Sequence, residues 1–124
     1  MGKERILIID DNQQDRKAMA VALKKSGYSD VSFAESGNEG IQVAASFRPD
    51  IVIIDVVLQE MDDGIDICKQ IKSIEGLQAK VIIITGHLEA IDAPKARTSG
   101  ADEIIEKKVG FANISQTIEA LKER

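Results

Sequence analysis

The chain of 124 residues carries 16 Lys and Arg against 21 Asp and Glu, which gives a net charge of −5. This acidic balance argues against general binding to nucleic acid or to anionic membranes, because both attract basic patches. The single cysteine excludes an internal disulfide, and apolar runs of about five residues are too short to span a membrane, so we expect a cytoplasmic protein.

In the first half of the chain, short apolar runs alternate with segments of helical spacing. The unbroken apolar run 6–9 predicts a strand, and apolar residues spaced by three and four predict a helix over residues 15–26. A more polar strand is expected at 31–34, and a helix around 40–45. The run 51–54 is again wholly apolar, which is typical of a strand buried on both faces of a parallel sheet.

The second half repeats this alternation. A helix over 67–74 is followed by the apolar strand 81–84 and by a short helix over 94–99, in which a proline stands in the first turn. The run 103–106 contains two glutamates, so we interpret it as an edge strand, and a helix over 111–121 follows.

Five strand–helix units with two polar edge strands predict an α/β fold. We expect a three-layer, doubly wound (βα)5 parallel sheet of the flavodoxin-like type, with strand order 2-1-3-4-5 and helices on both faces. Periodicity alone does not exclude a related fold with four strands.

Polar side chains follow four of the five predicted strands, at the edge where such sheets bind ligands. They are Asp10, Asp11, Asp55, Thr85 and Lys107, and Gly86 directly follows Thr85. Each one alone is explained by a helix cap, a turn or a solvated surface. Together, three carboxylates about 5 Å apart would repel one another by roughly 3 kcal/mol per pair, which a hard divalent cation such as Mg²⁺ or Mn²⁺ would offset.

A cation site beside a hydroxyl and an ammonium group suits phosphoryl transfer. The turn after the first strand is Asp-Asp-Asn-Gln-Gln and has no glycine-rich phosphate loop, so a bound nucleotide is disfavoured. The pattern therefore favours a carboxylate that itself accepts the phosphoryl group.

Five short segments stand in order along the chain: Ile8-Ile9-Asp10-Asp11, Ile53-Ile54-Asp55, Ile84-Thr85-Gly86, Gly100-Ala101-Asp102 and Lys107. Together they resemble the receiver domain of two-component response regulators over essentially the whole chain. The resemblance implies a single receiver domain over residues 1–124, with no output domain in this chain. It also implies a phosphoacceptor that catalyses only its own phosphorylation and dephosphorylation, and is not otherwise an enzyme.

The resemblance further implies a role for each site residue. Asp55 would be the phosphoacceptor, Asp11 a direct Mg²⁺ ligand, and Asp10 a ligand that acts often through water. The backbone carbonyl of Val57 would be another metal ligand. The residues that would bind the phosphoryl oxygens are Thr85, Gly86 and Lys107. The donor would be a phosphohistidine on a histidine kinase or a phosphotransfer protein.

The chain departs from the family pattern at three places. Residues 56–64 lack the usual proline and have one residue more than is usual, and Lys108 replaces a proline, so we expect a trans peptide bond or local strain there. Ile104 stands where the family often has Tyr or Phe, so no aromatic ring can turn inward on phosphorylation. Either the switch proceeds through the backbone and the fourth helix alone, or phosphorylation is only weakly coupled to the output surface, and we favour the first. His87 either tunes the lifetime of the phosphoryl group or is a solvated loop residue.

The resemblance places the output surface on the fourth helix, fifth strand and fifth helix, where a downstream protein, an output domain or a second copy would bind. Three rivals stay open: a receiver-like scaffold that is never phosphorylated, a phosphatase with an aspartyl intermediate, and a flavin- or nucleotide-binding module of the same strand order. The phosphatase is disfavoured because Val57 stands where a second aspartate is expected, and the nucleotide module because the first loop is acidic.

Overall fold

The computed structural model describes residues 3–58 and 63–123. In this part of the chain five strands form one sheet in the order β2-β1-β3-β4-β5, and all neighbouring pairs are parallel. The strands are β1 (Ile6–Ile9), β2 (Val31–Ala34), β3 (Ile51–Asp55), β4 (Lys80–Thr85) and β5 (Glu103–Glu106). The predicted strand order is confirmed.

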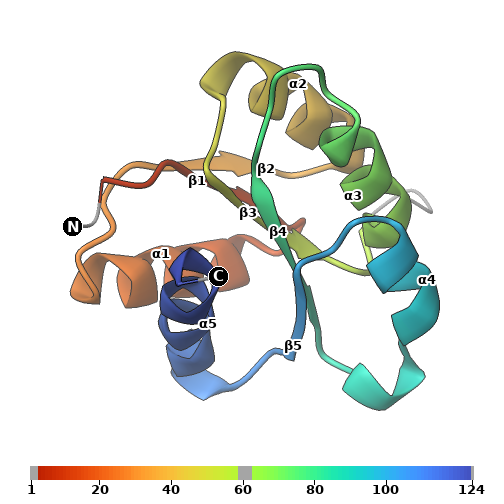
Figure 1. Cartoon of the computed structure of the whole chain (residues 1–124). Helices are drawn as coiled ribbons and strands as arrows, with labels where there is room; N and C mark the ends of the chain where they lie inside the picture. Colours follow the sequence, from red (N-terminus) through yellow and green to blue (C-terminus); the bar gives the residue numbers. More distant parts are fainter. Residues whose placement is uncertain (1–2, 59–62, 124) are drawn as a thin grey trace.

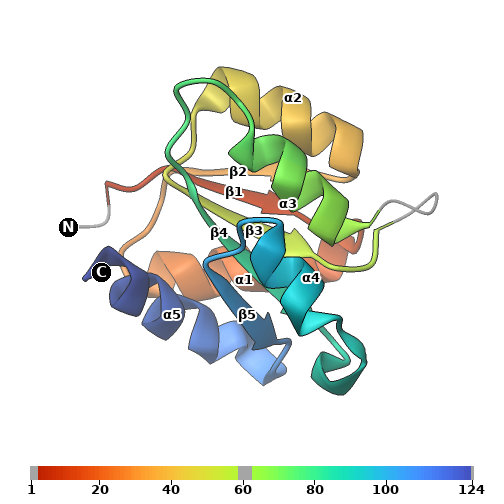
Figure 2. The same ribbon diagram turned by 45° about the vertical axis from the view of Figure 1, so that its right-hand side comes forward.

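Helices cover both faces of this sheet, which confirms the three-layer architecture. They are α1 (Gln13–Lys25), α2 (Gly37–Phe47), α3 (Gly64–Lys72), α4 (Ala93–Thr98) and α5 (Ala112–Lys122). The pair α1 and α5 lies against one face, and α2, α3 and α4 lie against the other (Figure 1, Figure 2).

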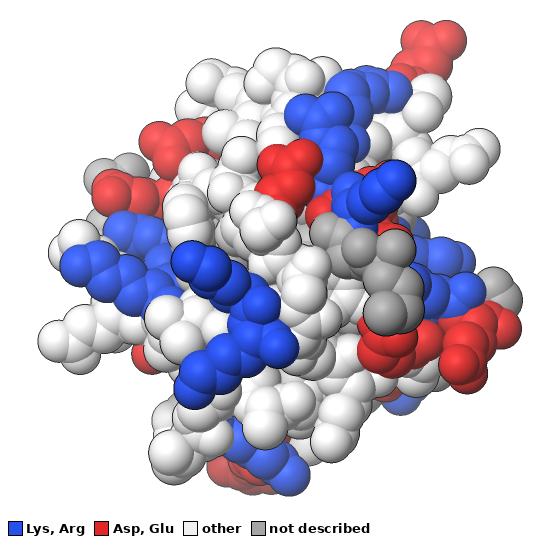
Figure 3. Space-filling view, turned by 90° about the vertical axis from the view of Figure 1, so that its left-hand side faces the viewer, with Lys and Arg blue, Asp and Glu red and all other residues white. Residues whose placement is uncertain are grey.

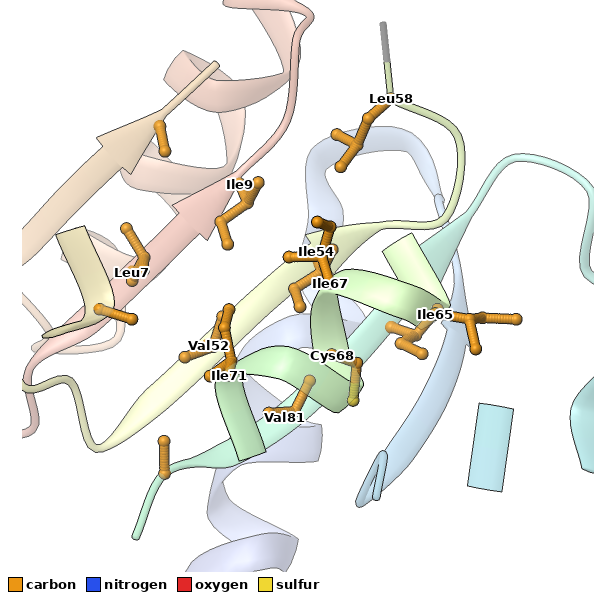
Figure 4. Close-up of a cluster of buried hydrophobic side chains, with 14 of the residues drawn as sticks. Leu7, Ile9, Val52, Ile54, Leu58, Ile65, Ile67, Cys68, Ile71 and Val81 are labelled. Carbon is orange, nitrogen blue, oxygen red and sulfur yellow. The ribbon is translucent and has the colours of Figure 1, made fainter. Parts of the chain in front are cut away.

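The central strands are wholly apolar because successive side chains point to opposite faces and both faces are covered. In β1, Leu7 and Ile9 pack toward α2 and α3, while Ile6 and Ile8 pack toward α1 and α5. Figure 4 shows the hydrophobic cluster between the sheet and helices α2, α3 and α4, in which Leu7, Ile9, Val52 and Ile54 face the side chains of α3. The edge strands β2 and β5 are only partly buried, which explains their polar residues.

The helices α1, α2, α3 and α4 start one to three residues before the predicted positions, and a side-chain cap determines each of these starts. The side chain of Asn12 accepts a hydrogen bond from the backbone N–H of Asp15, so α1 begins at Gln13 and not at residue 15. Asp92 caps α4 in the same way through the backbone N–H of Lys95, and Pro94 stands in the first turn. The earlier start of α1 places Asp15 in its first turn, beside the carboxyl ends of the strands.

The two ends of the described chain lie close together, at the amino-terminal edge of the sheet (Figure 2). Lys122 Nζ, at the end of α5, lies 3.4 Å from Glu4 Oε1. Figure 3 looks at the molecule from the side on which the N-terminus lies in Figure 1, and basic and acidic side chains are neighbours over this surface. None of the helices in residues 3–58 and 63–123 has the length and the apolar character needed to cross a membrane.

Candidate functional site

Three carboxylates meet at the carboxyl ends of β1 and β3. The parallel register pairs Ile9 with Ile54, so Asp10 and Asp55 leave adjacent strands at the same level. Carboxylate oxygens of Asp10, Asp11 and Asp55 all lie within 4.8 Å of one another. Asp10 is fully buried, Asp55 is 8% exposed and Asp11 is half-buried. The predicted convergence of these three side chains is confirmed.

This donor set suits a hard divalent cation. Carboxylate oxygens are the ligands that Mg²⁺ prefers, and a cation would offset the repulsion among three carboxylates. Burial raises the pKa of Asp10 above its ordinary value, and the nearby charge of Asp55 raises it further. The backbone N–H of Asn12 and the ammonium group of Lys107 act in the opposite direction.

Lys107, which follows β5, places its ammonium group against two of these carboxylates. Its Nζ lies 3.0 Å from Asp10 Oδ2 and 2.8 Å from Asp55 Oδ2. A third carboxylate, that of Asp15, accepts a hydrogen bond from the same nitrogen at 2.8 Å. Burial acts to lower the pKa of Lys107, but the hydrogen bonds to these three carboxylates outweigh it and raise that pKa.

Asp15 is a residue of the site that sequence reasoning missed. The signal lay in the cap: an Asn at position 12 with an Asp three residues later is typical of a helix start, and it places Asp15 in the first turn. Arg16 was missed as well. Its side chain is buried, and its Nη1 donates a hydrogen bond of 2.6 Å to the backbone carbonyl of Asp10.

Backbone donors bind the second carboxylate oxygens of Asp10 and Asp55. The N–H of Asn12 donates to Asp10 Oδ1 at 2.8 Å, and the N–H of Val57 donates to Asp55 Oδ1 at 3.0 Å. Val57 thus contacts Asp55 through its amide, while the role of its carbonyl as a metal ligand stays a prediction. The lack of a side chain lets Gly64 lie against the end of β3, because a Cβ there would lie 2.2 Å from the carbonyl oxygen of Asp55.

Thr85 ends β4 beside the same edge and is 3% exposed. Its Oγ1 accepts a hydrogen bond of 3.1 Å from the N–H of His87, and its carbonyl accepts one of 2.7 Å from the N–H of Lys107. Thr85, Val57 and His87 line one open hollow of about 510 Å³ between the loops that follow β3 and β4. The imidazole of His87 is 83% exposed and lies 3.8 Å from Glu89, so it faces solvent.

The departures from the family pattern lie around this site. No peptide bond among the described residues is cis, so the trans bond expected between Lys107 and Lys108 is confirmed. Ile104 is half-buried and packs against the hydrophobic cluster beneath α3 and α4. The loop 56–64 is described only at its two ends, and its predicted extra residue lies outside the described residues, because 59–62 are not among them.

Comparison with known proteins agrees with this geometry. The family profile of the response regulator receiver domain matches residues 6–119. Response regulator MprA of Mycolicibacterium vanbaalenii is 30% identical over 120 residues, which are 97% of this chain and 51% of that protein. The chain therefore spans about half the length of the curated relatives it matches.

Solved structures agree with the fold. The crystal structure of a LuxR-family two-component response regulator from an Aurantimonas species superposes with a TM-score of 0.85 at 29% identity, over 95% of this chain and 84% of that one. A two-component response regulator from Clostridium difficile superposes with a TM-score of 0.86 at 23% identity, over 98% of both chains, which is a likeness of fold.

Proposed function

The chain belongs to the response regulator receiver family, whose domains are phosphoacceptors and not conventional enzymes, and on that premise we propose that Asp55 accepts a phosphoryl group. The donor would be a phosphohistidine of a histidine kinase or a phosphotransfer protein. Membership of the family implies a kinase partner in a two-component system.

The observation that carries this proposal is the position of Asp55 between a cation site and a lysine. Its Oδ2 lies 2.8 Å from Lys107 Nζ, and one of its oxygens lies within 4.8 Å of one oxygen each of Asp10 and Asp11. Asp10 is less suited to be the acceptor because it is fully buried, whereas Asp55 is 8% exposed.

The acidic cluster is typical of the Mg²⁺ site of a receiver. We propose that its ligands are Asp10, Asp11, Asp55 and the backbone carbonyl of Val57, for Mg²⁺ or Mn²⁺. When bound, the cation supplies positive charge that neutralises the phosphoryl oxygens.

In the proposed reaction a carboxylate oxygen of Asp55 attacks phosphorus and forms a phosphorus–oxygen bond. The phosphorus–nitrogen bond of the phosphohistidine breaks, and its electron pair passes to the imidazole nitrogen, which leaves as the neutral ring when its other nitrogen carries a proton. The residues proposed to bind the phosphoryl oxygens are Thr85, Gly86 and Lys107. His87 would then influence access of the hydrolytic water.

We propose that phosphorylation shifts the population of two arrangements of the face formed by α4, β5 and α5. Ile104 has no aromatic ring to turn inward, so this switch would proceed through the backbone and α4. A downstream protein, an output domain or a second copy of the chain would bind that face.

Mg²⁺-dependent labelling by acetyl phosphate tests the proposal. Intact mass should show one added phosphoryl group in the wild type and in Asp66→Asn, a matched variant at an exposed acid of α3. Asp55→Asn should show none, and EDTA should abolish the label. Label retained in Asp55→Asn would overturn the assignment of Asp55 as the acceptor. A wild type that takes up no label from acetyl phosphate or from a panel of phosphorylated histidine kinases would favour a non-phosphorylated scaffold.

A further inference from the structure

The ammonium group of Lys107 has three carboxylate partners, one for each of its N–H donors. An ammonium group carries three N–H donors. Asp10, Asp15 and Asp55 each accept one of them, at 3.0, 2.8 and 2.8 Å. A phosphoryl oxygen can therefore bind Lys107 only when one of these three carboxylates gives up its place.

The three carboxylates differ in how firmly the fold holds them. The side chain of Asp10 is fully buried and that of Asp55 is 10% exposed, whereas that of Asp15 is 31% exposed. Backbone N–H groups bind the second oxygens of Asp10 and Asp55. Water can therefore solvate the released carboxylate of Asp15 more readily than that of Asp10 or Asp55.

Release of the Asp15 carboxylate would also leave α1 intact. The helix is capped through the backbone N–H of Asp15, which donates to the side chain of Asn12 at 2.9 Å. This bond does not involve the carboxylate, so the first turn keeps its cap whichever way the Asp15 side chain points.

We propose that Asp15 is a positioning residue that holds the ammonium group of Lys107 in the unphosphorylated site. When Asp55 is phosphorylated, a phosphoryl oxygen replaces the Asp15 carboxylate as a hydrogen-bond partner of Lys107. This inference rests on the proposed function, because it requires a phosphoryl group at Asp55. Asp15 would raise the local negative charge that favours a divalent cation, and it would oppose an incoming phosphoryl group both by competition for Lys107 and by like-charge repulsion. It would thereby shorten the life of the phosphorylated state.

The test compares two ligands that Asp15 should affect in opposite directions. Asp15→Asn keeps the shape of the side chain and removes its charge. With Mg²⁺ present, the affinity for beryllofluoride, a phosphoryl mimic observed by ¹⁹F NMR, should rise about fivefold, the typical effect of one partly exposed charge-assisted hydrogen bond. The affinity for Mg²⁺ alone should fall about twofold, because one nearby negative charge is lost.

Asp66→Asn is the matched control, because Asp66 is the first-turn acid of α3 as Asp15 is of α1. It should change neither affinity. A purely structural role for Asp15 would weaken both ligands together, and this result would overturn the inference. Unchanged beryllofluoride affinity would overturn it too, because Lys107 would then be leaving Asp55 and not Asp15. A wild type that binds no beryllofluoride would overturn the proposed function itself.

Discussion

Lys107 Nζ and Asp10 Oδ2 lie 3.0 Å apart although the two residues are separated by 97 positions in the chain. Asp10 is fully buried, and Lys107 is the cation that faces it. The parallel sheet brings the two residues together, because Asp10 follows β1, Lys107 follows β5, and both strands end at the same edge of the sheet. The lysine thus offsets the repulsion of a carboxylate cluster that the proposed metal would also offset.

Lys107→Ala should lower the free energy of unfolding by about 2 to 4 kcal/mol in EDTA, because it leaves mostly buried carboxylates without their cation. Millimolar Mg²⁺ should restore more stability to this variant than to the wild type, since the lysine and the metal interact with the same oxygens. Urea unfolding with and without Mg²⁺ measures both effects. Lys69→Ala, at an exposed lysine of α3, is the control; equal stability of both variants would contradict the prediction.

Gly64→Ala should disturb the loop beside Asp55. A Cβ at this position would lie 2.2 Å from the carbonyl oxygen of Asp55, and backbone atoms cannot move aside as the end of a side chain can. We expect a loss of about 2 kcal/mol or more in the free energy of unfolding. At Gly86 no atom lies within 4 Å of the added Cβ, so Gly86→Ala should change stability by less than about 0.5 kcal/mol. Similar losses in both variants would refute this explanation.

Tyr28, the single tyrosine of the chain, should ionise above its ordinary pKa of 10.0. Burial raises its pKa, and the hydrogen bond that its hydroxyl donates to Glu119 raises it further, against the opposite effect of Lys122. The folded state therefore favours the neutral phenol. The resulting contribution of Tyr28 to the free energy of unfolding is lost as the pH rises past the pKa that Tyr28 has in the unfolded chain.

Ultraviolet titration of the tyrosinate band measures this pKa directly. The midpoint should lie higher in the native protein than in urea, and Glu119→Gln should lower the native midpoint because the carboxylate that favours the neutral phenol is gone. A native midpoint equal to that in urea would show that Tyr28 is solvated in the folded protein.

Cys68 should be unreactive toward thiol reagents in the folded protein. It is fully buried, its Sγ lies 3.8 Å from the carbonyl oxygen of Ser99, and burial raises its pKa above 9.0. The reactive thiolate is therefore disfavoured. Ellman's reagent should react with one thiol per chain in urea and with almost none under native conditions. Rapid reaction of the native protein would show that the region between α3 and α4 opens readily.

Most of the fold could be predicted from the sequence, because every residue of a central strand must carry an apolar side chain. Ile6 to Ile9 must be apolar throughout, since helices cover both faces of the sheet, and this makes the run visible without any structure. The ends of such runs then locate Asp10 and Asp55, and the more polar edge strand 103–106 locates Lys107, because the carboxyl ends of parallel strands share one edge.

The order of the strands and the set of polar groups that meet at their ends could thus be inferred from the sequence alone. The contact of Lys107 with Asp15, and the hydrogen bond from the amide of Val57 to Asp55, became visible only in the folded structure. The physical reason is one of scale. Periodicity reports which face of an element is buried, whereas a hydrogen bond depends on the start of a helix and on side-chain direction to within a fraction of an ångström.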